Sequence, residues 1–126
     1  DRVGLFNPRL GRNGQSLIGG EENDLFARLR AAGELLYFVP NAAIYHHIPD
    51  AKLTDEYFDR LSYNVGRSKA LRAQSDEEFS ELMASERRKR VVTYILAALY
   101  TIALQPIKGQ YLIRMRKGIY KGVKQL

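Results

Sequence analysis

The residues best suited to chemistry follow a pair of glycines near the start of the chain. Gly19 and Gly20 precede two carboxylates, Glu21 and Glu22, and a third acidic residue, Asp24, comes two positions later. Glycine lets the backbone approach a ligand closely, and carboxylates are common general bases. The same pattern also fits a plain helix start, because acidic side chains in the first turn stabilise the helix dipole. Both interpretations stay open on these residues alone.

Two other places carry candidate functional side chains. His46 and His47 follow a short apolar run, and adjacent strand residues point to opposite faces, so we do not expect both to bind one metal. One of them near the carboxylates would suit a metal or a phosphate, and the alternative is a surface pair. Arg67 and Lys69 follow Gly66 in a helical pattern and are either phosphate or sugar contacts or solvated cations.

Several familiar kinds of site are excluded by the 126 residues. The sequence has no Cys, which excludes a disulfide, a thiolate zinc site and a cysteine nucleophile. It also contains no Rossmann or P-loop glycine motif and no Asp-x-Asp triplet. A metal hydrolase using Glu21, Glu22 and His46 is disfavoured because the spacing typical of metal ligands is missing.

Short strands and helices are the elements that must position these residues. Apolar runs that end at turn residues predict strands over 3–6, 35–39 and 43–46. Capping residues, apolar spacing and proline predict four helices. We expect them from Glu21 to Gly33, from Thr54 onward, from Ser75 to Gln105, and from Ile107 onward.

Charge is distributed very unevenly along the chain. Residues 1–86 hold 10 basic and 14 acidic side chains, whereas residues 87–126 hold 10 basic and no acidic ones, and the formal net charge is +6. The uncharged run 91–104 is too short to span a bilayer as a helix. A basic tail of this kind suits an anionic membrane surface. The alternative is a helical hairpin that packs on the rest of the chain or on a second copy.

Taken in order, these motifs resemble the C-terminal part of family 2 glycosyltransferases, which have the GT-A fold. The resemblance covers residues 2–74, more than half of the chain. Its main segments are Val3-Gly4-Leu5-Phe6-Asn7-Pro8, Gly20-Glu21-Glu22-Asn23-Asp24-Leu25, Tyr37-Phe38-Val39-Pro40, Ile44-Tyr45-His46 and Gly66-Arg67-Ser68.

The resemblance implies an α+β fold that is mostly helical. Residues 1–74 would be the C-terminal portion of a GT-A α/β domain, with short strands and an acceptor-side helix. Residues 75–126 would be a helical, basic, membrane-associated tail. The nucleotide-binding half would lie outside this chain, so we expect the chain alone to be inactive. The sequence has no Trp and therefore lacks the Gln-x-x-Arg-Trp motif of processive polysaccharide synthases.

The implied reaction is inverting sugar transfer from a nucleotide-sugar donor to an acceptor hydroxyl, in the assembly of surface polysaccharide or glycolipid. Glu22 matches the catalytic base, with Glu21 as the neighbouring candidate because the family pair is Glu-Asp. His46 matches a histidine near the donor diphosphate and its divalent metal, Mg or Mn, which residues outside this chain would mostly hold. The expected substrate contacts are Gly19, Gly20, Asp24 and Arg67.

Location and partners follow from the tail. We expect a cytoplasmic protein, peripheral at the inner face of the plasma membrane, that contacts anionic lipid and no nucleic acid, and a homodimer is a further expectation. The alternative function is a non-enzymatic basic helical module that binds an anionic membrane or nucleic acid, with residues 1–74 as its scaffold.

Overall fold

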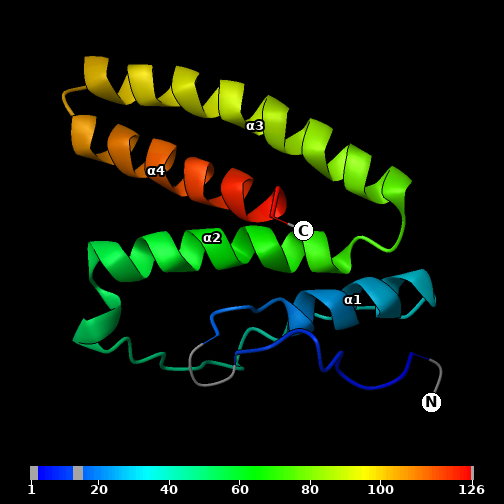
Figure 1. Cartoon of the computed structure of the whole chain (residues 1–126). Helices are drawn as coiled ribbons and strands as arrows, with labels where there is room; N and C mark the ends of the chain where they lie inside the picture. Colours follow the sequence, from blue (N-terminus) through cyan, green and yellow to red (C-terminus); the bar gives the residue numbers. More distant parts are fainter. Residues whose placement is uncertain (1–2, 13–15, 126) are drawn as a thin grey trace.

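Four α-helices form the body of the protein. The computed structural model describes residues 3–12 and 16–125. It contains α1 (Glu21–Ala31), a short 3-10 helix η1 (Asp50–Lys52), α2 (Asp55–Arg72), α3 (Asp76–Ile102) and α4 (Pro106–Val123). The helices stack in the order α1, α2, α4, α3, so the last helix lies between α2 and α3 and packs against both (Figure 1).

The expected α+β fold is wrong, because the described residues form helices and no strand. The apolar runs 35–39 and 43–46 are irregular and exposed, with Phe38 88% and Tyr45 99% accessible. Segment 3–6 is also irregular. A strand exists only when its backbone groups pair with a neighbouring strand, and none of the described segments pairs with these runs. The chain is therefore not an α+β fragment of a GT-A domain.

The four helices themselves are confirmed, and the expected side chains cap two of them. Thr54 Oγ1 accepts a hydrogen bond of 3.2 Å from the Tyr57 N–H, and Ser75 Oγ accepts one of 3.1 Å from the Glu78 N–H. The Glu78 carboxylate accepts a hydrogen bond from the backbone N–H of Gln74, whereas in a capping box it would accept one from the N–H of Ser75. The third helix ends at Ile102, three residues earlier than expected, and Pro106 begins the next one.

Glycines bring α2 and α4 into close contact. A Cβ added to Gly66 would lie 2.1 Å from the carbonyl oxygen of Ile119, and one added to Gly122 would lie 2.0 Å from that of Tyr63. On the other side of α4, a Cβ on Gly109 would lie 2.9 Å from the carbonyl oxygen of Ala97. Glycine at these positions lowers helix propensity, but it allows the backbones to approach.

The apolar core lies where α2, α3 and α4 meet. Ala70, Ile119 and Val123 are buried there, and partly buried side chains from α3 and α4 surround them. The apolar residues of α4 that recur every four positions, from Ile107 to Val123, are therefore buried toward the C-terminal end of the helix. Ile107 at its start is 67% exposed. The core joins residues on both sides of position 74, and the division into segments 1–74 and 75–126 stays a prediction.

Candidate functional site

A pocket of about 500 Å³ lies between the start of α1 and one face of α2. Residues from three separate parts of the sequence line it. Five residues proposed from the sequence are among them, namely Gly19, Gly20, Glu21, Glu22 and His46. The structure thus brings the glycine pair, the carboxylate pair and one of the two histidines to the same place.

The turn at Gly19 and Gly20 is held against α2 by one hydroxyl group. The backbone N–H of Gly19 donates a hydrogen bond of 3.0 Å to Ser68 Oγ, and this hydroxyl donates in turn to the carbonyl of Asn64 at 2.8 Å. Gly20 precedes the first residue of α1 with φ 97°, a left-handed conformation that favours glycine. These two features fix where the first turn of α1 begins.

The two carboxylates differ in their exposure. Glu21 is half-buried, and its carboxylate lies beside Gly11 and Gly19, 3.8 Å from where a Cβ on either glycine would be. Glu22 also lines the pocket but is exposed to solvent. An exposed carboxylate at a pocket can receive a proton from a bound hydroxyl and pass it to water. Both carboxylates line the pocket, and Glu22 is the one open to solvent.

Three cations line the same pocket, and only Lys69 among them was singled out from the sequence. They are Arg12, Lys69 and Arg72. Arg72 lies against Gly20, its Nε 3.8 Å from where a Cβ would be, and this buried Nε has no hydrogen-bond partner in the part of the chain described. The available signal was the spacing of Leu61, Val65, Ser68, Lys69 and Arg72 in α2, which places them on one helix face.

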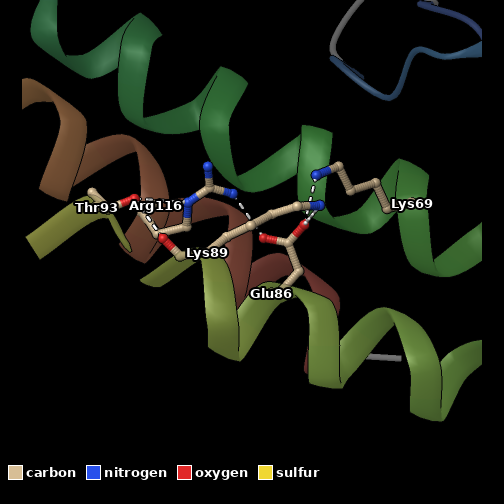
Figure 2. A network of polar contacts seen from close by, with 5 residues as sticks. All are labelled: Lys69, Glu86, Lys89, Thr93 and Arg116. Atoms are coloured by element: carbon tan, nitrogen blue, oxygen red, sulfur yellow. Dashed lines mark hydrogen bonds and ion pairs between the residues drawn. The ribbon is translucent and has the colours of Figure 1, made fainter. Parts of the chain in front are cut away.

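Lys69 also belongs to a buried ion-pair network behind the pocket. Its ammonium group lies 2.8 Å from Oε1 of Glu86, whose side chain is completely buried (Figure 2). Arg116 pairs with the other oxygen of Glu86 at 2.8 Å, and Lys89 approaches Oε1 at 3.4 Å. Burial raises the pKa of Glu86, but the hydrogen bond and charge of Lys69, with Arg116 and Lys89, outweigh burial and hold this pKa below its ordinary value.

Two residues proposed as substrate contacts lie outside the pocket lining. Asp24 forms an ion pair of 2.9 Å with Arg28 one turn later in α1. The backbone nitrogen of Arg67 faces α4, 3.0 Å from where a Cβ on Gly122 would be. His47, the other histidine of the pair, does not line this pocket either.

The proposed metal ligand, His46, is an exposed residue at the edge of the pocket. Within residues 3–12 and 16–125, no group of three or more His, Cys, Asp or Glu side chains is arranged to hold a metal ion. The Mg or Mn requirement stays a prediction.

Comparisons with protein-family profiles, with curated proteins and with solved structures found no match to this chain. The resemblance of residues 2–74 to family 2 glycosyltransferases accordingly stays a hypothesis. The pocket between α1 and α2 supplies the structural basis on which a function is proposed below.

Proposed function

We propose that this chain carries the acceptor-side pocket of an inverting glycosyltransferase, with Glu22 as its general base. The observation that supports the proposal is the composition of one pocket, which combines an exposed carboxylate with three cations. Transfer from a nucleotide-sugar needs both kinds of group. A base must take the proton of the acceptor hydroxyl, and positive charge must stabilise the departing diphosphate.

In the proposed reaction, the acceptor oxygen attacks the anomeric carbon from the face opposite the nucleotide. The carbon–oxygen bond to the diphosphate breaks, and the diphosphate leaves with the bonding electron pair. Glu22 accepts the proton of the attacking hydroxyl, so the charges balance without another co-reactant. Glu21, the adjacent carboxylate in the same pocket, is the second candidate for this role.

Arg12, Lys69 and Arg72 would face the phosphate side of this reaction. Charge-assisted hydrogen bonds to phosphate oxygens are stronger than neutral ones, and the buried Nε of Arg72 is a donor with no partner in the described residues. Residues of the first turn of α1 line the same pocket, and helix N-termini attract anions. The nucleotide-binding half and the divalent metal would come from outside these residues.

The phosphate side can be tested on the chain as it stands. We expect inorganic pyrophosphate to bind in calorimetric titration, and Arg72→Met to weaken the affinity by about tenfold because a charged donor is lost. Arg30→Met, which removes an exposed arginine of α1 that does not line this pocket, is the matched control. Equal affinities for the two variants, or no binding by the unaltered chain, would contradict the phosphate side of the proposal.

The base is tested by sugar transfer in a protein that includes the donor-binding half. Glu22→Gln should lower kcat about a hundredfold or more while leaving the donor affinity unchanged, because the amide cannot accept the proton. Glu21→Gln is the paired variant. Transfer that survives Glu22→Gln and fails with Glu21→Gln would assign the base to Glu21, and transfer that survives both would exclude this carboxylate pair.

A further inference from the structure

The second half of α3 carries apolar side chains on nearly every side. The side that contains Thr93 and Ala97 is buried against α4. Val91, Ile95 and Ile102, on the opposite side, are 61%, 57% and 78% exposed. A helix that is apolar all round belongs in a core or in a membrane, and large exposed apolar patches mark interaction surfaces. This side of α3 therefore requires a partner.

The exposed residues form one continuous strip along the helix. Positions 91, 95, 99 and 102 recur at spacings of three and four, so their side chains lie on one helix face. Helix α3 is the outermost layer of the stack, and no other helix covers that side (Figure 1). Leu104 in the turn after α3 is 89% exposed. The outer α3 face is defined here as Val91, Ile95, Leu99, Ile102 and Leu104.

Positive charge adjoins the outer α3 face where this face begins. Arg88 is exposed one turn before Val91 on the same side of the helix. Residues 87–126 contain no acidic side chain. The same side of the first half of α3 is different, because it carries the exposed acids Glu77 and Glu81. An apolar strip with positive charge beside it is the chemistry of helices that bind anionic bilayers.

We propose that the outer α3 face, in the second half of the helix, rests on an anionic lipid bilayer. No helix in the described residues is long and apolar enough to cross a membrane. Residues 91–102 extend only about 18 Å at the helical rise, against a hydrocarbon core of about 30 Å. The apolar side chains enter the boundary between headgroups and acyl chains, and Arg88 contacts lipid phosphates.

Charge complementarity favours lipid over a second copy of the chain. Two outer α3 faces placed together would bring Arg88 of both copies into one interface, and residues 87–126 offer no carboxylate to pair with them. Nucleic acid would satisfy the cations but leave the apolar strip in water. The surface involved is also not that of α4, because Ile119 and Val123 of α4 are already buried in the core.

Vesicle flotation tests the proposal. We expect the chain to float with phosphatidylcholine vesicles that contain phosphatidylglycerol, less at high salt and less without the anionic lipid. Ile95→Glu combined with Leu99→Glu should abolish flotation, whereas Ala84→Glu, an exposed position on the same side of the first half, should not. Arg88→Glu should weaken binding about tenfold, and Lys52→Glu, with the same change in charge, should not.

Four results would overturn the proposal. They are no flotation of the unaltered chain, flotation that persists in the folded double glutamate variant, salt-sensitive binding to duplex DNA without vesicle binding, and a dimer that the glutamates dissociate without vesicle binding. Circular dichroism establishes that each variant is folded. None of these variants alters the pocket between α1 and α2, so this proposal and the proposed function fail independently.

Discussion

The hydroxyl of Ser68 accepts a hydrogen bond of 3.0 Å from the backbone N–H of Gly19, a residue 49 positions earlier in the chain. Ser68 is buried in α2, and its hydroxyl also donates to the carbonyl of Asn64. One side chain thus fixes the turn that begins α1 to the helix that carries Lys69 and Arg72. The carboxylate side and the cation side of the pocket are joined at this contact.

Ser68→Ala should loosen that turn. The N–H of Gly19 loses its acceptor in a partly buried position, which costs about 1–2 kcal/mol of the free energy of unfolding. Urea denaturation measures this cost, and hydrogen exchange at the Gly19 amide should become faster. Ser80→Ala removes an exposed serine of α3 and is the control. Unchanged exchange at Gly19 would show that the hydroxyl does not restrain the turn.

Glu86→Gln should destabilise the protein at neutral pH. The carboxylate is fully buried and is paired with Lys69, Lys89 and Arg116, so the amide leaves these cations poorly compensated. We expect a loss of about 2–3 kcal/mol in the free energy of unfolding, measured by urea denaturation. Glu81→Gln, at an exposed position of the same helix, should change stability little.

The Glu86 network also predicts how stability depends on pH. The pKa of Glu86 is held below its ordinary value of 4.5 in the folded protein, where burial is outweighed by Lys69, Arg116 and Lys89. The stabilisation is therefore fully present above pH 4.5 and is lost as the pH falls below that value through the folded pKa. In the Glu86→Gln variant, the thermal unfolding temperature should fall less steeply as the pH drops below 4.5. A variant whose unfolding temperature falls as steeply as that of the unaltered protein would contradict this prediction.

Gly66→Ala should destabilise the protein although alanine is the better helix former. In an open helix the change would add about 1 kcal/mol of stability. Here the new Cβ would lie 2.1 Å from the carbonyl oxygen of Ile119, so α2 and α4 must separate. We expect a net loss of about 1–3 kcal/mol, with a smaller loss for Gly109→Ala, whose nearest atom is 2.9 Å away. A stabilised Gly66→Ala variant would exclude this close packing.

The pKa of Tyr111 should lie above its ordinary value because of Asp55. The phenol donates a hydrogen bond of 2.5 Å to Asp55, which raises the pKa of Tyr111 chiefly through that bond and then through the carboxylate charge. Asp55→Asn should lower the pKa of Tyr111 toward its ordinary value, measured by NMR of labelled tyrosine. Asp59→Asn removes a carboxylate that pairs with Arg114 and should have the smaller effect. Equal effects would refute the assignment to Asp55.

The features of this fold that depend on residues close together in the sequence could be predicted from the sequence. Thr54 and Ser75 cap the helices that follow them, and Pro106 begins the last one. Each of these interactions spans only a few residues, so its outcome is encoded locally. The three strands expected from the apolar runs are absent, because a strand also requires a pairing partner and the described chain provides none.

The same distinction between local and long-range effects applies to the candidate site. The sequence by itself identified the glycine pair, the adjacent carboxylates and His46 as candidates, because their types and order are visible in it. Only the tertiary structure brought Lys69 and Arg72 to the same pocket and placed Asp24 and Arg67 outside its lining. The tertiary structure also shows that the glycines of α2 and α4 allow close packing, and that the outer α3 face is exposed. Such outcomes depend on how helices far apart in sequence pack together, which local pattern and propensity do not determine.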